Sequence, residues 1–442
     1  MPKIDIDSAP RGDGTTYPDA FAGPCLSRRR WKLGDAAGLT QFGVNLLRLP
    51  DGAWSSQRHW HEAEDEFVMV VEGEVVLVEE DGETILRAGA EIGYLHRGYE
   101  KQSETVFYNM VVPYAERMNY CSTIHNASAW CYAVEQLMGI EAPARAQAIR
   151  VITSEMARIT DHCVCLGANM VDLGALTNFW YLNNVREKML FLFQELSGAR
   201  MMTNYPRIGG VVQDLPDGWI AKLRQSMEDM KGLVGDVKDL VSNNRIFIDR
   251  TQGVCPTTKE RALNFGWTGP CLRSTGLSMD LRKDQPYWGY ERYDFKVPVY
   301  QNGDTMDRLL IRFDEMEESR KIILQALDKL PDGPHLIDDH LVVLPEKDKV
   351  YNQMEALINH FKLVMHGVRP PKGEIYSFTE SPNGELGFYI ISDGSPRAWR
   401  VRVRPPCFAN YSAFPQMLQG AMVADVAAAL GSINIIAGEL DR

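Results

Sequence analysis

The stretch that decides the fold runs from Pro143 to Gly174 and reads PARAQAIRVITSEMARITDHCVCLGANMVDLG. Its apolar residues recur at intervals of three and four, which places them on one face of a helix. Pro143 suits the first helical position, and Gly174 suits a helix end. The stretch therefore predicts one long amphipathic helix, whose apolar face consists of Ile149, Ile152, Met156, Ile159, Cys163, Leu166 and Met170.

Similar helical periodicity appears before and after this stretch, and β alternation appears near the C-terminus. Pro382-Asn383-Gly384 and Asp393-Gly394 have the composition of hairpin turns between the predicted strands. The pattern as a whole predicts an α+β fold. The pattern is helical from Ser122 to about Gly232, with an apolar face at Ala129, Val134, Leu137 and Met138 before Pro143. Further helices are predicted over 177–196, 219–242, 305–330, 352–366 and 415–430, and strands over 374–380, 385–392 and 398–405.

Composition restricts the class of protein. The chain has 442 residues, 45% of them hydrophobic, and a net charge of −12, which disfavours nucleic-acid binding through the bulk field. Its eight cysteines include no C-x-x-C pair, so we expect a reducing compartment and no iron–sulfur cluster held by this chain. No secretory signal and no run of about 18 apolar residues is found. Any membrane association is therefore expected to depend on partners.

The first ninety residues differ in character from the rest. Residues 1–40 are polar and rich in Gly and Pro, which predicts a poorly ordered lead-in with at most one strand. Residues 41–91 contain short β-branched runs at Phe67–Val71, Val75–Val78 and Thr84–Leu86, separated by turn residues. A β segment of hairpins is predicted there.

This β segment carries a candidate metal site. His59 and His61 stand two apart, so on a strand both imidazoles point to the same side, and Glu66 follows five residues on. Two histidines and one carboxylate are a ligand set for iron or manganese. With Gly52 and Gly73, the order resembles the first cupin motif, G-x(5)-H-x-H-x(3,4)-E-x(6)-G.

The resemblance implies a divalent metal at His59, His61 and Glu66. The second cupin motif does not follow Gly89, so residues 41–91 are expected to be a truncated cupin-like segment with unpaired strand edges. The interpretation favoured on these grounds is a hairpin packed on a partner, with solvated histidines.

From Ile92 onward, an ordered set of motifs resembles the 49-kDa-type (D) subunit of NADH:quinone oxidoreductase, the respiratory complex I. Each motif alone is weak, but their order is specific. They include Ile92–Gly98 (IGYLHRG), Arg117–Tyr120 (RMNY), Ala133–Glu135, Ile149–Ile152, Asp172–Ala175, Arg207–Gly210, Leu281–Lys283, Met354–Ile358, His360–Lys362, Ser392–Gly394 and Gly438–Arg442 (GELDR).

The resemblance implies a domain over 92–442 with the fold of the large subunit of nickel–iron hydrogenases: a helical bundle with β-hairpins. Those enzymes hold their metal with two C-x-x-C pairs, and this chain contains none. Soft thiolates are what such a site needs, so a hydrogenase activity is excluded. The family instead uses the corresponding cavity for a quinone headgroup.

The resemblance also assigns roles to three residues. Tyr120 matches the tyrosine that binds one quinone oxygen, and Asp172 matches the aspartate that pairs with a histidine across the headgroup. Arg117 matches the arginine beside the terminal iron–sulfur cluster, which a neighbouring subunit holds. The alternative structural interpretations are a half-buried core tyrosine for Tyr120, a polar residue at a helix end for Asp172 and a surface salt bridge for Arg117. His162, mid-helix, is interpreted as a core histidine.

The implied function is that of a peripheral-arm subunit coupling electron transfer from NADH to quinone with proton translocation. Expected partners are the cluster-bearing subunit, the C or 30-kDa-type subunit, and the membrane subunit through which quinone enters. Quinone is the substrate, and no flavin or NAD is expected on this chain, since no G-x-G-x-x-G follows a strand. The expected location is the cytoplasmic face of the cell membrane, or the matrix side in mitochondria.

Three departures from the family pattern keep alternatives open. The family's H-P-S-T-H-G segment, whose second histidine pairs with the aspartate, is not found before the first shared motif. Met201-Met202-Thr203 stands where many relatives have a histidine, and Asn119 replaces an aspartate. A non-catalytic or fusion-derived scaffold is therefore the second hypothesis, and a metal-binding cupin module is the third.

Overall fold

The computed structural model describes residues 8–13, 23, 26, 29–32, 45–48 and 84–442. The chain divides into two compact units, Met1–Val71 and Glu72–Arg442. In the first unit, β1 (Arg29–Lys32) and β2 (Asn45–Arg48) pair antiparallel. A strand within the first forty residues is thus observed. The candidate metal ligands His59, His61 and Glu66, and the runs 67–71 and 75–78, lie outside the described residues.

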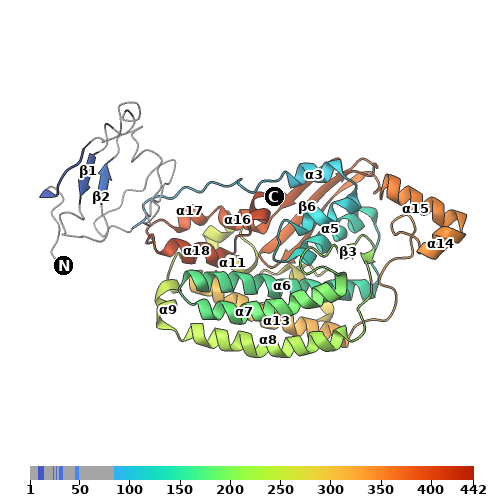
Figure 1. The fold of residues 1–442 in the computed structure, drawn as a ribbon, viewed down its shortest axis with the longest axis horizontal. Coiled ribbons are helices and arrows are strands. Elements are labelled where there is room, and N and C mark those ends of the chain that lie inside the picture. The colour runs from blue at the N-terminus through green and yellow to red at the C-terminus, as the bar shows by residue number, and fades with distance from the viewer. Residues whose placement is uncertain (1–7, 14–22, 24–25, 27–28, 33–44, 49–83) are drawn as a thin grey trace. The chain divides into compact units, whose positions relative to one another are not determined.

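Long helices form the body of the second unit (Figure 1). The predicted central helix is observed as α6, which packs against α7 and α13, while α8 packs against α7 and α13. Their ends agree with the sequence signals to within a few residues. The bounds are α6 Ala144–Asp172, α7 Leu176–Ser197, α8 Trp219–Ser242 and α13 Thr305–Asp328.

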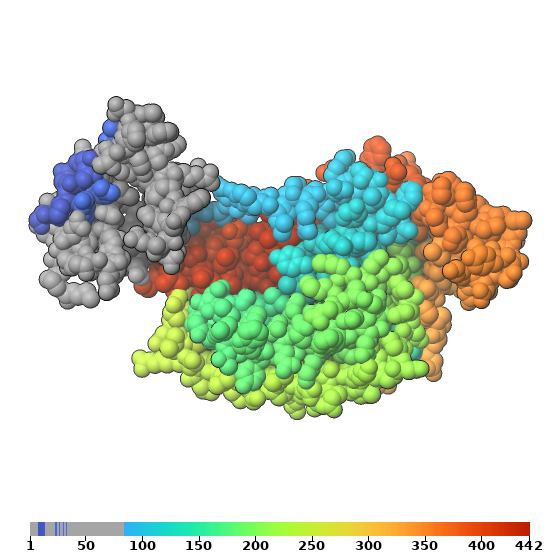
Figure 2. Space-filling model, viewed as in Figure 1, coloured from blue at the N-terminus to red at the C-terminus, as the bar shows by residue number. Residues whose placement is uncertain are grey.

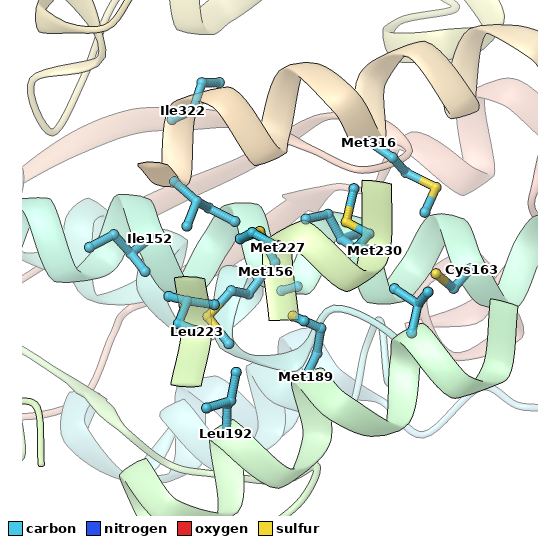
Figure 3. Packing of buried hydrophobic residues seen from close by; sticks show 14 of the residues in the cluster. Ile152, Met156, Cys163, Met189, Leu192, Leu223, Met227, Met230, Met316 and Ile322 are labelled. Atoms are coloured by element: carbon cyan, nitrogen blue, oxygen red, sulfur yellow. The ribbon is translucent and has the colours of Figure 1, made fainter. Parts of the chain in front are cut away.

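The core between these helices is rich in sulfur-containing side chains (Figure 3). All seven apolar residues predicted for the buried face of α6 are buried. Methionine is unbranched and polarizable, so it fills the irregular gaps between helices well. The labelled core residues are Ile152, Met156 and Cys163 of α6, Met189 and Leu192 of α7, Leu223, Met227 and Met230 of α8, and Met316 and Ile322 of α13.

The three predicted C-terminal strands form one antiparallel sheet in the order β5–β6–β7. The turn between β5 and β6 places Ser381 opposite Gly384, and the β6–β7 pairing places Gly387 opposite Arg404. Helix α5 covers this sheet, with the Trp130 ring edge-on to Phe388 at 5.5 Å. The bounds are β5 Gly373–Ser381, β6 Gly384–Ser392, β7 Arg400–Arg404 and α5 Thr123–Met138.

The single helix predicted over 415–430 is wrong. The structure has two shorter helices, α17 (Phe414–Met417) and α18 (Asp425–Ile433). Between them Gly420 adopts φ +78°, and its backbone N–H donates to the carbonyl of Ile85. The Ile85 N–H donates back to Ala421, so the chain breaks the helix to pair with an upstream strand-like segment.

That pairing also corrects the strand predicted at Thr84–Leu86, while the residues before Thr84 that would complete its hairpin lie outside the described residues. Thr84 forms an isolated antiparallel bridge with Met422 rather than a described strand. The helix predicted over 352–366 is observed as α15 (Met354–His366), and Gln353 separates it from the preceding α14 (Lys347–Asn352), which was not predicted. Gln353 has extended backbone angles, which interrupt the helix.

Short elements between the long ones were not predicted. The mixture of a helical bundle and small antiparallel sheets confirms the α+β class. Within the part of the chain that the structure describes, no helix is long and apolar enough to cross a membrane. The remaining elements are α3 Tyr99–Thr105, η3 Tyr108–Met110, α4 Val112–Glu116, β3 Pro206–Arg207, β4 Gly210–Val211, α9 Arg245–Thr251, α10 Lys259–Asn264, α11 Gly269–Arg273, α12 Leu281–Asp284, η4 Tyr290–Arg292, α16 Pro406–Tyr411 and α19 Ala437–Asp441.

Candidate functional site

A cavity of about 520 Å³ lies beside the C-terminal half of α6 and is bordered by α18 and the C-terminal tail. Its volume suits a small organic ligand, and its walls are mainly aliphatic. Few polar groups face it, which is the usual arrangement where a handful of groups orient a ligand. The lining residues are Tyr120, Cys121, Val164, Cys165, Ala168, Asn169, Asp172, Tyr411, Ala427, Leu430, Gly431, Asn434, Ile435, Ile436 and Leu440.

Two of the three residues singled out in the second unit line this cavity. Tyr120 follows α4, and its side chain is partly exposed, at 36%. Burial raises the pKa of the Tyr120 hydroxyl, as do the neighbouring thiols of Cys121 and Cys407. A hydrogen bond from the Ala437 backbone opposes this shift. The phenol is therefore protonated at neutral pH and can donate a hydrogen bond into the cavity.

Asp172 is the last residue of α6 and is exposed to solvent. A carboxylate at a helix C-terminus meets the negative end of the helix dipole, so the position is intrinsically unfavourable for it. Among the described residues that line the cavity, none is a histidine. The structure therefore brings Asp172 to the same cavity as Tyr120, but without a described imidazole beside it.

A narrow crevice shares two lining residues with this cavity, Tyr120 and Cys121. Arg186, Arg200 and Met201 also line the crevice. The guanidinium of Arg186 approaches the Met201 sulfur at 4.0 Å. The crevice thus has two cationic side chains, which share the carboxylate of Glu187, and a thioether that cannot titrate.

Arg117 does not line either space. It caps the C-terminal end of α4, and its Nη1 donates to the Pro113 carbonyl at 2.6 Å. Its own carbonyl accepts from Arg97 at 2.6 Å. The exposed guanidinium therefore folds back on its own helix in this chain.

Behind the cavity wall lies a buried polar network that sequence reasoning missed. Asn434 donates from Nδ2 to Asp161 Oδ1 and to Asn383 Oδ1, both at 2.5 Å. Asn119 donates from Nδ2 to Asp161 Oδ2 at 3.0 Å. Burial raises the pKa of Asp161, while these amides and His162 oppose the shift. The amide at Asn119 is explained by this contact, because an aspartate there would oppose a second carboxylate.

Cys407 and Glu439 form the other part of this network. The Cys407 thiol donates to Glu439 Oε2 at 2.7 Å, and it accepts from Asn383 Nδ2 at 3.4 Å. Both residues are fully buried, and burial raises the pKa of Glu439 to about 7. The sequence signal was the terminal GELDR motif, but nothing in it indicated a thiol partner 32 residues upstream.

Two motifs from opposite ends of the unit hold the tail in place. The backbone N–H groups of Gly93 and Leu95 donate to the two carboxylate oxygens of Asp441, at 2.9 and 2.7 Å. The Arg97 N–H donates to the Arg442 carbonyl. The IGYLHRG and GELDR motifs therefore pair, and this fixes Leu440, a cavity residue, in position.

Other candidates are placed elsewhere or not at all. His162 is buried in α6, and its Nε2 lies 2.9 Å from Glu315 Oε2, as expected for a core histidine. The cupin-like ligands His59, His61 and Glu66 are outside the described residues. Within the described ranges, no group of three or more His, Cys, Asp or Glu side chains is placed to hold a metal ion.

Comparison with known proteins matches two family models to the chain. The family model for the 49 Kd subunit of respiratory-chain NADH dehydrogenase matches residues 172–442. A cupin-domain model matches residues 45–93. The two matches therefore cover separate parts of the sequence.

Individual relatives extend the match further. The C/D subunit of NADH-quinone oxidoreductase from Bdellovibrio bacteriovorus is 50% identical over 367 residues, which are 83% of this chain and 66% of that longer protein. The D subunit from Pelobacter propionicus is 46% identical over 82% of this chain and 90% of its own length. The D subunit from Myxococcus xanthus is 44% identical over 83% and 88%. The chain therefore belongs to the family of the 49-kDa (D) subunit of NADH-quinone oxidoreductase, the respiratory complex I.

Proposed function

We propose that this chain, with its neighbouring subunits, forms the site where NADH:quinone oxidoreductase reduces quinone. One observation carries the proposal: Tyr120 and Asp172, from separate elements, line the same mainly aliphatic cavity. Its volume accommodates a quinone headgroup. The electrons come from an iron–sulfur cluster on a partner subunit, and the reaction is coupled to proton translocation by the whole complex.

The chemistry asked of this chain is hydrogen bonding and proton supply. Reduction of a quinone to a quinol takes two electrons and two protons. The Tyr120 hydroxyl donates a hydrogen bond to one quinone oxygen and gives up its proton as that oxygen becomes basic. Its raised pKa keeps the phenol protonated until then. Asp172 orients and polarises groups at the other end of the headgroup.

The crevice beside Tyr120 supports a partner at this place. Arg186 and Arg200 line it and share the carboxylate of Glu187, so one net positive charge remains, which favours a cluster that accepts electrons. We assign this face to the cluster-bearing subunit, with Arg117 near the same contact. The C/D relative joins two subunits in one polypeptide, which supports an adjacent C or 30-kDa-type subunit. The membrane subunit would meet the opening of the cavity, and the chain would lie on the cytoplasmic or matrix side.

The experiment uses the assembled oxidoreductase with Tyr120→Phe. Phenylalanine keeps the ring packing but cannot donate a hydrogen bond or a proton. Quinone-dependent NADH oxidation should fall by about 100-fold, within the range of a lost proton donor. Electron transfer from NADH to a water-soluble acceptor should stay at the wild-type rate. Tyr411→Phe, in the same cavity, is the matched control. Equal quinone rates for wild type and Tyr120→Phe would contradict the proposal.

A non-catalytic or fusion-derived scaffold is the second candidate. It is favoured by one observation, that no histidine stands beside Asp172 among the described lining residues. It predicts assembly without quinone reduction, and rescue when a segment carrying H-P-S-T-H-G is supplied at the N-terminus. Quinone reduction by the chain as it stands would exclude it.

We also propose the domain organisation expected from the sequence: a lead-in over 1–40, a truncated cupin-like segment over 41–91, and the 49-kDa-type domain over 92–442. The cupin-domain match to residues 45–93 supports it. Tryptic digestion of the natural complex should release AGAEIGYLHR, residues 88–97, which spans the junction. Its repeated absence beside peptides from both flanks would contradict this organisation.

The less favoured proposal is that the cupin-like segment also binds a divalent metal at His59, His61 and Glu66. Such a metal would be lost on His59→Ala.

A further inference from the structure

Helices α14 and α15 extend from the body of the second unit (Figure 1) and form the orange projection in Figure 2. In α15, Ala356 and Leu363 are buried, at 6% and 8% exposure. They stand seven residues apart, so they mark one narrow face of the helix. This small face is the side through which α15 packs on the rest of the chain.

The opposite side of α15 is apolar and exposed. A surface helix of a globular protein normally turns its apolar stripe toward the core. In α15 the large apolar residues instead recur at i, i+3, i+4, i+7 and i+11 on the solvent side, and we name them the α15 apolar face. They are Met354 (72% exposed), Leu357 (48%), Ile358 (43%), Phe361 (57%) and Met365 (55%).

A groove of about 970 Å³ runs beside this face. Its other wall includes Leu341, Val342 and Ile140. Leu341 is 70% exposed. Contiguous apolar surface of this kind marks a contact with another macromolecule rather than a pocket for a small molecule.

The charges at the groove select the chemistry of its occupant. Lys362 and Arg369 line it, against the single carboxylate of Asp339. The groove therefore has one net positive charge, whereas the chain as a whole carries a net charge of −12. Carboxylates on a partner would be attracted to Lys362 and Arg369.

We propose that the α15 apolar face and this groove bind an amphipathic helix of another subunit of the oxidoreductase. That helix would carry large apolar residues at i, i+3 or i+4 and i+7, with Asp or Glu beside them. A helix fits better than a strand, because α15 offers no free backbone edge for strand addition, whereas an apolar groove beside a helix suits helix docking. This surface is separate from the Tyr120 cavity, so the two proposals fail independently.

The first test places a photo-crosslinker, p-benzoylphenylalanine, at position 361 of the full chain in the assembled oxidoreductase. The probe keeps an aromatic ring at an exposed position, so the fold is preserved. After irradiation, the cross-linked peptide is sequenced. We expect one segment of a different subunit, helical in pattern, with acidic residues within one turn of the attachment point. Attachment to a second copy of this chain, to lipid or to no polypeptide would each overturn the proposal.

The second test measures how firmly the chain stays in the complex. Phe361→Asp should raise the fraction released on gel filtration at least tenfold, because a charge would enter an apolar contact. Phe361→Leu keeps an apolar side chain, so it should stay in the complex like the wild type. Lys362→Glu should weaken binding more at low salt than at high salt. Leu240→Asp, at an equally exposed position on α8 (56%), is the matched control. Equal release of Phe361→Asp and Leu240→Asp would overturn the proposal.

Discussion

The thiol of Cys407 donates a hydrogen bond to Glu439 at 2.7 Å, directly behind the wall of the Tyr120 cavity. No arginine or lysine pairs with this carboxylate among the contacts that the structure describes around it. A buried carboxyl without a cationic partner prefers its neutral form. This explains why burial raises the pKa of Glu439 to about 7.

The raised pKa makes a prediction about stability and pH. The folded state binds the Glu439 proton more tightly than the unfolded state, whose pKa is near 4.5. The stabilisation is therefore complete below pH 4.5 and is lost as the pH rises through about 7. The side chain of Glu439→Gln stays neutral at every pH, so this variant does not lose that stabilisation. The difference in the free energy of unfolding, variant minus wild type, should therefore rise by on the order of 3 kcal/mol between pH 4.5 and pH 8.

Urea unfolding of the full chain at several pH values measures this difference. Glu355→Gln, on the exposed side of α15, is the matched control and should show a difference from wild type that does not vary with pH. A flat difference for Glu439→Gln as well would show that the carboxyl titrates alike in the folded and unfolded states.

The Asn119–Asp161 contact predicts the outcome of an exchange. Asn119→Asp alone would set two carboxylates against each other in a buried site, and should destabilise by roughly 2–4 kcal/mol at pH 8 and by less at pH 5. The double variant Asn119→Asp, Asp161→Asn restores one donor and one acceptor, so it should recover part of the loss. Asn119→Ala removes the bond without adding charge; because that bond lowers the pKa of Asp161, its loss should also destabilise more at pH 8 than at pH 5, but less than Asn119→Asp does. Strict additivity in the double variant would contradict this account.

Replacing Gly269 or Gly218 distinguishes two costs of adding a Cβ atom: strain in the backbone conformation and a clash with neighbouring atoms. Both have positive φ, at +66° and +75°. A Cβ at Gly269 would lie 2.5 Å from the Gly384 Cα in the β5–β6 turn, whereas a Cβ at Gly218 would meet nothing within 4 Å. Gly218→Ala should lower the free energy of unfolding by about 1–2 kcal/mol through backbone strain alone. Gly269→Ala should lower it by roughly 2–5 kcal/mol, since backbone must also move. Thermal unfolding of both variants checks the order, and similar losses would contradict it.

The long elements were predictable from sequence because their signals are local. The three- and four-residue spacing in 149–170 reports the buried face of α6, and the turn Pro382-Asn383-Gly384 reports the β5–β6 hairpin. The helix predicted over 415–430 failed because its competitor is distant: the carbonyl of Ile85 takes the Gly420 N–H. No local pattern around Gly420 contains that partner.

The residues of the candidate site fall into the same two groups, those with a local sequence signal and those that depend on distant contacts. Tyr120 and Asp172 were found through motifs, and the structure places both on one cavity. Asn434, Asp161 and Cys407 were missed, because each is an ordinary polar or small residue in its own segment. Their significance comes from contacts between segments that are hundreds of residues apart, such as Asn434 to Asp161.

The pairing of Asp441 with the Gly93 and Leu95 amides predicts how the cavity wall is kept in place. Asp441→Ala removes the acceptor of both hydrogen bonds, so hydrogen exchange at those two amides should accelerate by at least about tenfold. Leu440 lines the cavity next to this contact, so the same variant should raise the KM for quinone more than it lowers kcat. Asp338→Ala, at an exposed position away from the tail, is the control and should change neither quantity. Unchanged exchange at Gly93 and Leu95 in Asp441→Ala would show that the tail is held by other contacts. In that case the two motifs would be neighbours without depending on each other.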